Sequence, residues 1–310
     1  NEIKRVADRC TVLRKGALVG TVDVRDTTVE HMAEMMVGRK ISFEVNKAAA
    51  TPGEVVLSVK GLTVPGRQGR KAVKNVTFDV RAGEIVCIAG IDGNGQSELV
   101  YALSGLLTPE AGSIAFNGRD ITDADIRTRN DLGLAHIPED RHRHGLVLDY
   151  DLSENLALKT YHTEALQAHG FIRFDAVRSQ AERLIDTYDI RSAQGADTTV
   201  RSMSGGNQQK TIVAREIDTN PELLLAVQPT RGLDVGAMMY IHEQLVRVRD
   251  EGKAVLLVSL ELDEVFQLAD RILVIFEGQI VAELAGATAT AQELGLYMSG
   301  SRKGERHDKV

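Results

Sequence analysis

A continuous apolar run that leads into a glycine-rich turn is the feature that most constrains this fold. Residues 84–90 read EIVCIAG, and residues 90–97 read GIDGNGQS. An apolar run without polar alternation is typical of a strand that is buried on both faces of a sheet. Apolar residues then recur at helical spacing over residues 96–107, and the Thr108-Pro109 pair is expected to end that helix. The pattern therefore predicts a strand, a tight turn and a helix, the repeating unit of α/β domains.

The glycine-rich turn, which begins at Gly90, matches the phosphate-loop pattern G-x-x-x-x-G-K-[ST] at every specified position except one. Gln96 stands where the pattern has lysine. Backbone N–H groups of the turn are expected to point into one concavity at the start of the helix, where the helix dipole favours phosphate oxygens. These groups belong to Gly93, Gly95, Gln96 and Ser97. The Ser97 hydroxyl would contact Mg²⁺. A glycine turn that binds no ligand is the alternative interpretation.

The bulk properties argue against several classes of protein. With 310 residues, the chain is long enough for about two domains. Its net charge of −7 argues against nucleic-acid binding, because such domains are usually basic. No apolar run approaches the ~20 residues that span a bilayer, and we expect no signal peptide. Cys10 and Cys87 show neither disulfide nor metal spacing, so Cys87 is interpreted as a buried strand residue.

Two segments near opposite ends of the chain resemble each other. Residues 1–22 read NEIKRVADRCTVLRKGALVGTV, and residues 263–284, 262 positions later, read DEVFQLADRILVIFEGQIVAEL. The two share Ala-Asp-Arg and a later glycine. Each predicts the end of a helix, a strand, a glycine turn and a second strand. We interpret the pair as an internal repeat, and a chance match between two helix–hairpin segments is the alternative.

The repeat divides the chain into a remnant and one complete domain. Residues 1–39 are predicted to be the closing part of a first domain, and the polar, Ala-rich residues 40–53 a linker. Residues 54–300 are predicted to form the second, complete domain. Strand and helix patterns alternate in it, which indicates a mostly parallel sheet, and a helical insertion is expected at about 140–205. The charged residues 301–310 are predicted to be a disordered tail.

Two further motifs indicate chemistry. In RSMSGGNQQK, residues 201–210, Ser204 can cap a helix that begins near Asn207, which leaves two glycine amides at the positive end of that helix. This arrangement predicts a second anion-binding site, although Ser-Gly-Gly is also a common helix cap. In LLLAVQPTRGLDVGA, residues 223–237, a buried strand is followed by Pro-Thr, a glycine turn and an acidic residue.

The order of these three motifs resembles the nucleotide-binding domain of an ABC transporter. The resemblance covers residues 54–300, and residues 1–39 resemble the closing part of a preceding copy. The strings PEDRHRHGLVLD, QPTRGLDVGA and VSLELDE are similar to the nucleoside (purine) branch among the tandem-domain ATP-binding subunits of bacterial sugar and nucleoside importers. The resemblance implies an α/β fold: a P-loop ABC ATPase core with a parallel sheet, an antiparallel β-subdomain and an inserted helical subdomain.

In the family that this chain resembles, two such domains face each other. Each ATP lies between the phosphate loop of one domain and the Ser-Gly-Gly signature of the other. The resemblance assigns nucleotide binding to Gly90, Gly93, Gly95, Gln96, Ser97 (also a weak Mg²⁺ ligand) and Glu139. It assigns the signature offered to the partner site to Ser204, Gly205, Gly206, Asn207 and Gln208, and the loop that touches the partner domain to Asp234.

Four positions depart from the family pattern, and all four are neutral. Gln96 replaces a lysine, and Val227 replaces the aspartate that holds Mg²⁺. Gln228 replaces the glutamate that polarises water, and Leu260 replaces the histidine that contacts the γ-phosphate. One unit charge about 4 Å from phosphate is worth roughly 4 kcal/mol, and each ~1.36 kcal/mol is about tenfold in rate. We therefore predict that no catalytic group is intact in this copy and that it hydrolyses no ATP itself.

The resemblance implies the ATP-binding subunit of a nucleoside importer, which acts by ATP-driven closure. Its cofactors would be ATP and Mg²⁺, the latter mainly at the partner site. Its partners would be the first ABC domain of the same protein, two transmembrane permease subunits and, through them, an extracellular substrate-binding lipoprotein, with no nucleic acid. It would lie peripherally on the cytoplasmic face of the cell membrane. The alternatives are a non-catalytic regulatory or structural nucleotide-binding module and a sugar (ribose- or galactose-type) importer subunit.

Two polar clusters have plainer interpretations. Three histidines in HIPEDRHRHG, residues 136–145, are interpreted as part of an exposed basic turn, with a metal site as the alternative. Three acidic residues in LDYDLSENLAL, residues 148–158, are interpreted as the start of a helix, with a cation site as the alternative. The resemblance places this second region near the permease, so an interaction surface is its functional interpretation.

Overall fold

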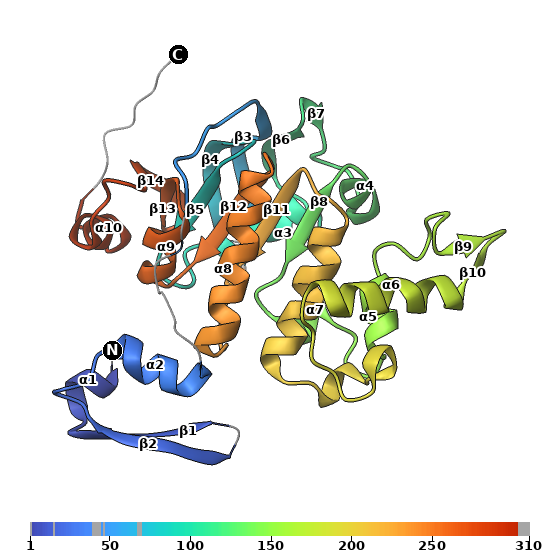
Figure 1. Ribbon diagram of the computed structural model, residues 1–310. Helices are drawn as coiled ribbons and strands as arrows, with labels where there is room; N and C mark the ends of the chain where they lie inside the picture. The colour runs from blue at the N-terminus through green and yellow to red at the C-terminus, as the bar shows by residue number, and fades with distance from the viewer. Residues whose placement is uncertain (1, 15, 39–44, 46, 67–69, 303–310) are drawn as a thin grey trace.

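The largest layer of the computed structural model, which describes residues 2–14, 16–38, 45, 47–66 and 70–302, is a six-stranded sheet. Its strands are β5 Ile85–Ala89, β8 Leu134–Ile137, β11 Leu223–Val227, β12 Ala254–Ser259, β13 Arg271–Phe276 and β14 Gln279–Ala285. Their order is β14-β13-β5-β12-β11-β8 (Figure 1). Neighbouring strands are parallel from β13 to β8, and β14 pairs antiparallel at one edge.

A second sheet is antiparallel, with the order β4-β3-β6-β7. Its strands are β3 Val55–Pro65, β4 Lys71–Arg81, β6 Ala111–Phe116 and β7 Arg119–Asp120. Its apolar side chains join those of helix α3, Gln96–Ser104, and one face of the larger sheet in a single buried cluster. The fold class expected from the sequence, an α/β core with an antiparallel β-subdomain, is confirmed.

Strand β5 shows why its run is apolar at every position. Val86 and Ile88 face the cluster under the antiparallel sheet, whereas the alternate residues face the helices on the other side. Those alternate residues are Ile85, Cys87 and Ala89. Cys87 is fully buried, and burial raises the pKa of its thiol. The interpretation of Cys87 as a buried strand cysteine is confirmed.

Helices cover the opposite face of the six-stranded sheet (Figure 1). They include α7 Gly205–Asp218, α8 Val235–Asp250, α9 Leu262–Leu268 and α10 Ala291–Met298, while α4 Ile126–Asp131 precedes β8. Helix α3 is shorter than expected. It ends at Gly105, whose φ of 85° is left-handed, and not at the Thr108-Pro109 pair. No described helix is long and apolar enough to cross a membrane.

The insertion between β8 and β11 contains a hairpin as well as helices. Its elements are a π-helical turn Arg141–Gly145, α5 Leu152–Ala157, β9 Gln167–Ala168, β10 Phe171–Ile172, α6 Phe174–Thr187, two short 3-10 turns, Gly195–Asp197 and Val200–Ser202, and the start of α7. The expectation of a mostly helical stretch missed the hairpin, which projects from the molecule (Figure 1). It turns through His169 and Gly170, both with positive φ. Asp151 and Glu154 form a capping box on α5, so they begin a helix as expected.

The N-terminal segment has the same order of elements as the end of the chain. Its elements are α1 Glu2–Val6, β1 Arg9–Arg14, β2 Ala17–Asp23 and α2 Val29–Val37. At the offset of 262 residues, β1 and β2 coincide with β13 and β14 at both ends, and α2 begins where α10 begins. Both hairpins shift register at the same step, Val12/Leu13 and Val274/Ile275. The segment lies apart from the six-stranded sheet, below α8 (Figure 1).

Candidate phosphate loop and signature helix

The glycine loop links the end of β5 to the start of α3, and its close contacts require glycine. A Cβ on Gly90 would lie 2.7 Å from the carbonyl oxygen of Ile275. A Cβ on Gly95 would lie 2.4 Å from the carbonyl oxygen of Ala72, and the φ of Gly95 is 98°. The antiparallel sheet, through Ala72 in β4, therefore packs directly against the loop.

The side chain of Gln96 folds back into this loop. Its Oε1 accepts a hydrogen bond from the backbone N–H of Asn94 at 3.0 Å. Its Nε2 donates to the carbonyl oxygen of Ile91 at 2.9 Å. Gln96 is 5% exposed, so both halves of its amide are satisfied by the loop's own backbone.

Asn94 anchors the loop to the turn between β13 and β14. Its side-chain Nδ2 donates to the carbonyl oxygen of Ile91 at 2.9 Å, and its Oδ1 accepts from the N–H of Glu277 at 2.7 Å. Its own carbonyl oxygen accepts from the N–H of Gly278 at 3.0 Å. The sequence analysis did not single out Asn94. An amide side chain between two glycines was the available signal.

At the start of α3, the Ser97 hydroxyl lies 3.2 Å from a carboxylate oxygen of Glu139 and donates to it. The other carboxylate oxygen of Glu139 accepts from Arg231 at 2.7 Å. Arg141 in turn donates to the carbonyl oxygen of Arg231 at 3.1 Å. The structure thus brings together Ser97 and Glu139, two of the residues assigned to nucleotide binding, and adds two arginines that the sequence analysis missed.

Ser204 caps α7, which begins at Gly205, two residues earlier than expected. The Ser204 hydroxyl accepts from the backbone N–H of Asn207 at 3.5 Å and from its side-chain amide at 2.9 Å. A Cβ on Gly206 would lie 3.3 Å from that of Ala237, so the first turns of α7 and α8 are in close contact. Ser204 is exposed, which leaves the positive end of α7 open to solvent.

The glutamines that follow the signature glycines face inward. Gln208 donates to the carbonyl oxygen of Val200 at 3.0 Å and bonds the ring of His142 at 2.9 Å. The next residue, Gln209, donates to the carbonyl oxygen of Pro229 at 2.8 Å. Asp234 caps α8 by accepting from the N–H of Ala237 at 2.9 Å. Gln208 and Gln209 therefore hold α7 against its neighbours, and the exposed part of the signature is its first residues.

Comparison with known proteins decides the family. A family model described as "ABC transporter" matches residues 73–231, about half of the chain. The chain belongs to the ABC transporter family. The nucleoside import ATP-binding protein NupA of Lactococcus lactis is 50% identical over 98% of this chain and 60% of its own length. The guanosine import ATP-binding protein NupO of Bacillus subtilis is 49% identical over 97% of this chain and 59% of its own length.

More distant relatives carry sugar names. A ribose import ATP-binding protein of Rubrobacter xylanophilus is 36% identical over 97% of this chain and 56% of its own length. Among solved structures, the dimeric bacterial ABC transporter cassette MJ0796 matches with a TM-score of 0.65 at 23% identity, over 75% of this chain and all of that one. This ABC chain spans about 60% of the length of the nucleoside-type relatives it matches.

The oxygen donors of this ABC domain do not fit a bound Mg²⁺ at its own phosphate loop. Mg²⁺ is held by oxygen ligands in near-octahedral geometry. Ser97 and Glu139 supply oxygens, but Glu139 is already paired with the guanidinium of Arg231. Val227, at the end of β11, is 3% exposed and apolar. No step of catalysis is therefore assigned to a metal here.

The two remaining substituted positions border a cavity of about 630 Å³ in this ABC domain. Gln228 follows β11 with a φ of 43°, and its N–H donates to the carbonyl oxygen of Val258. Leu260 follows β12, and neither residue supplies a charged group. Helices α1 and α2 close the other side of the cavity, through residues that include Lys4 and Met36.

The lining of this cavity includes a buried carboxylate that the sequence analysis missed. Glu264 on α9 is 4% exposed and accepts from Thr230 at 2.7 Å and from the ring of His242 at 2.9 Å. Burial alone would raise the pKa of Glu264, but hydrogen bonds from His242, Ser259 and Thr230 and the charge of His242 hold it below its ordinary value. Because Thr230 lies in the turn that leads to Asp234, its hydrogen bond to Glu264 anchors that turn to α9.

We expect the substitution Glu264→Gln to lower the free energy of unfolding by about 2 kcal/mol at pH 7. The hydrogen bonds from Thr230 and His242 would remain, but each would change from a charge-assisted to a neutral one, at a cost of roughly 1 kcal/mol each. Because the pKa of Glu264 is depressed, its contribution is present above the ordinary value of 4.5 and is lost as pH falls through the folded pKa. The variant should therefore lose less stability than the unaltered chain on acidification.

Denaturant titration at pH 7 and below pH 4.5 measures both effects. Glu261→Gln is the matched control, because Glu261 lies next to α9, is exposed and makes no side-chain cap. An equal loss of stability in the two variants would show that the buried carboxylate has no special role.

The histidine cluster is not one exposed turn. His136 lies within β8, its Nε2 is buried without a hydrogen-bond partner among the described residues, and burial lowers its pKa to about 4. His142 and His144 lie in the exposed π-helical turn Arg141–Gly145. The expectation failed for His136 because its strand continues through it. Within the described ranges, no group of three potential ligands could hold a metal ion.

Proposed function

We propose that this chain is the second half of the ATP-binding subunit of a nucleoside importer. The observation that carries the proposal is the identity of 50% and 49% to nucleoside and guanosine import proteins over nearly the whole chain. The ribose import relative reaches 36% over a similar span. The subunit would drive uptake by closing two ABC domains around ATP.

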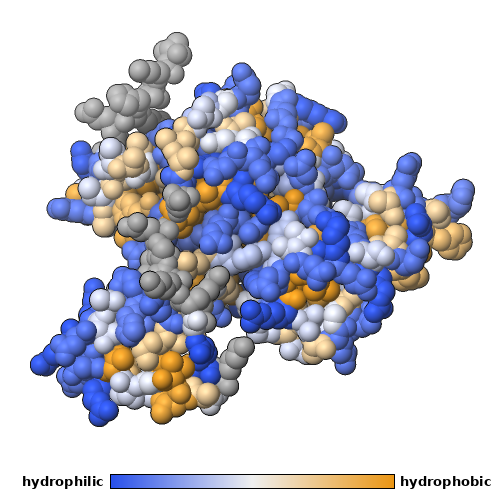
Figure 2. Space-filling view, viewed as in Figure 1, coloured by the Kyte–Doolittle hydropathy of each residue, from blue (hydrophilic) through white to orange (hydrophobic). Residues whose placement is uncertain are grey.

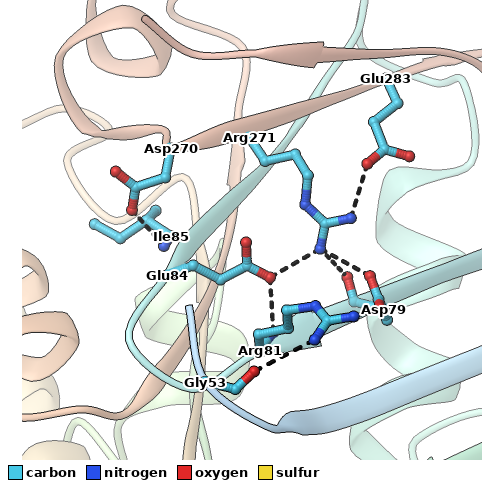
Figure 3. A network of polar contacts seen from close by, with 8 residues as sticks. All are labelled: Gly53, Asp79, Arg81, Glu84, Ile85, Asp270, Arg271 and Glu283. Atoms are coloured by element: carbon cyan, nitrogen blue, oxygen red, sulfur yellow. Dashed lines mark hydrogen bonds and ion pairs between the residues drawn. The ribbon is translucent and has the colours of Figure 1, made fainter. Parts of the chain in front are cut away.

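We propose a first ABC domain as the partner of this one, and the support comes from a polar network around Arg271 whose residues recur in the N-terminal segment. Figure 3 shows Arg271 on β13 reaching Asp79 and Glu84 at 2.9 and 2.8 Å and Glu283 at 2.8 Å. Burial acts to lower the pKa of Arg271, but the hydrogen bonds to these carboxylates raise it overall. The neighbouring Asp270 accepts from the N–H of Ile85 at 2.8 Å. The network fixes the edge of the large sheet to β5 and to the antiparallel sheet.

The N-terminal segment keeps the residues of this network but not their environment. Asp8 and Arg9 correspond to Asp270 and Arg271 at the offset of 262 residues. The side chain of Asp8 is 93% exposed, against 12% for Asp270. Asp8 and Arg9 are thus suited to partners in a preceding domain of the same fold.

Apolar positions of the two segments differ in the same way. Val6 is 85% exposed, whereas Leu268, its counterpart, is fully buried. Leu13 is 64% exposed, whereas Ile275 is fully buried. Figure 2 shows apolar side chains at the surface of this segment. These positions in the second copy pack against the core of a complete domain, which supports the interpretation of residues 1–39 as the end of a first one.

In the proposed tandem protein, the two ATP sites are unequal. This domain would offer the N-terminus of α7, at Ser204 and Gly205, to the phosphate loop of the first domain. Its own phosphate loop, with Gln96, would support no chemistry. ATP and Mg²⁺ would act mainly at the other site, and Asp234 would lie in the loop facing the first domain.

The whole subunit would work with two transmembrane permeases and, through them, with an extracellular substrate-binding lipoprotein. It would lie peripherally on the cytoplasmic face of the membrane. Sugar import is the second candidate, favoured by a glucose import relative of Haloferax volcanii at 43% identity. A non-catalytic regulatory module is the third, favoured by the neutral residues at the phosphate loop.

Uptake by whole cells tests the substrate. A strain that lacks the gene for the whole protein should lose uptake of labelled guanosine and adenosine, and plasmid-borne restoration should recover it. Labelled ribose and glucose serve as controls and should be taken up equally with or without the gene. Loss of sugar uptake with unchanged nucleoside uptake would favour the second candidate, and no change for any solute would favour the third.

A further inference from the structure

The hydrogen bonds of Gln96 bear on whether this loop can bind a phosphate. The side chain is almost completely buried, and its two polar atoms bond two backbone groups of the loop, the N–H of Asn94 and the carbonyl of Ile91. We propose that Gln96 determines the specificity of the loop by excluding the phosphates of ATP. Its side-chain amide acts as a resident ligand and occupies the place that a phosphate would take. The proposal rests on the proposed function, in which this loop supports no chemistry.

The chemistry of the two side chains explains the exchange of lysine for glutamine. A lysine ammonium has three donors and no acceptor, so it could bond the carbonyl of Ile91 but would leave the N–H of Asn94 for a phosphate oxygen. The glutamine amide has both a donor and an acceptor. Its Oε1 takes that N–H, as a phosphate oxygen would. A phosphate entering the loop would therefore have to displace Oε1 and would find no positive charge from this side chain in return.

Two other side chains of the loop, those of Asn94 and Ser97, are also bonded within the chain. Asn94 is bonded to Ile91, Glu277 and Gly278, which ties the loop to the turn between β13 and β14. The Ser97 hydroxyl donates to Glu139, whose charge is balanced by Arg231. We therefore expect the loop to keep one conformation whether or not nucleotide is present.

Hydrogen exchange on the 310-residue chain, with and without millimolar ATP and Mg²⁺, tests this directly. In the unaltered chain, exchange over residues 91–97 should be the same in both conditions. In Gln96→Ala the loop should exchange at least about tenfold faster without ATP, because two bonds are lost, and ATP should slow it again. Gln96→Lys should bind ATP at least about tenfold more tightly than the unaltered chain in a calorimetric titration.

Asp92→Asn is the matched control for Gln96→Lys. Asp92 is exposed in the same loop, and its replacement changes the net charge by the same amount without touching the amide bonds. It should exchange and bind as the unaltered chain does. If ATP slows exchange in the unaltered loop as much as in Gln96→Ala, or if Gln96→Lys binds no more tightly than Asp92→Asn, the proposal is wrong.

The measurements on Gln96→Lys and on the unaltered chain test the proposal even if Gln96→Ala does not fold. Phosphate release from the same unaltered sample separates this proposal from the proposed function. If ATP slows exchange in the loop of the unaltered chain and no phosphate is released, the proposal that Gln96 is a resident ligand is wrong, but the proposal that the site is non-catalytic stands. Measurable hydrolysis would overturn the non-catalytic site itself.

Discussion

Aspartate in place of Gly205 is expected to lower the ATPase rate of the proposed tandem protein at least about a hundredfold, the loss typical for removal of one key hydrogen-bond donor to a reacting anion. Gly205 is the first residue of α7, whose cap is the neutral hydroxyl of Ser204. The adjacent α8 is capped by the carboxylate of Asp234. Of the two neighbouring helix ends, the end of α7 is therefore the one whose positive dipole is left for an external anion.

The substitution should act through charge and not through misfolding. A Cβ on Gly205 would first meet the guanidinium of Arg141 at 3.2 Å, the end of a flexible side chain. Gly295→Asp, in α10, is the matched control, because a Cβ there meets nothing within 4 Å and the φ is not left-handed. It should leave the rate unchanged.

Steady-state phosphate release by purified tandem protein, with circular dichroism to confirm folding, measures the effect. Ser204→Arg should also reduce the rate, because a long side chain would fill the space in front of the helix. Full activity in both Gly205→Asp and Ser204→Arg would show that α7 contributes nothing to the partner site.

The 310-residue chain alone is expected to release phosphate from ATP no faster than a protein-free blank. A variant with Gln96→Lys, Val227→Asp and Gln228→Glu should exceed that rate at least about a hundredfold at high protein concentration. Each restored charge near phosphate is worth up to roughly 4 kcal/mol, and the contributions do not add fully. A second copy of the chain would supply the end of α7 that the restored site needs.

Adding Gly205→Asp to this triple variant gives the control, since it should abolish the regained activity while leaving the three restored residues in place. The assay is phosphate release with and without Mg²⁺, at several protein concentrations. Vigorous hydrolysis by the unaltered chain would contradict the argument from lost charges. So would a triple variant whose rate is independent of Mg²⁺.

The larger elements of the fold could be predicted because their signals are local. The apolar run of β5 and the helical spacing after the glycine loop are visible in the sequence itself. The end of α3 was placed too late because the helix ends at Gly105, which adopts a left-handed conformation, and not at the Thr108-Pro109 pair that follows. Strands β9 and β10 have two residues each, too few to show any periodicity.

The candidate site likewise contains residues that the sequence could predict and residues that it could not. Motif spacing identified Gln96 and Ser97, and the structure places Ser97 beside Glu139. The bond partners of Gln96 could not be predicted, because the same spacing suits a side chain that points outward. Arg231 and Glu264 were missed because each acts on a residue far along the chain, 92 positions away for Arg231 and Glu139 and 34 for Glu264 and Thr230.

The register shift shared by the two hairpins bears on the ancestry of the chain. A bulge adds one residue to one strand, and alternation of apolar residues alone does not dictate where it occurs. Two unrelated hairpins would have no reason to shift at corresponding steps, as Val12/Leu13 and Val274/Ile275 do. We infer that the two hairpins descend from one duplicated gene segment, whose bulge both copies have kept.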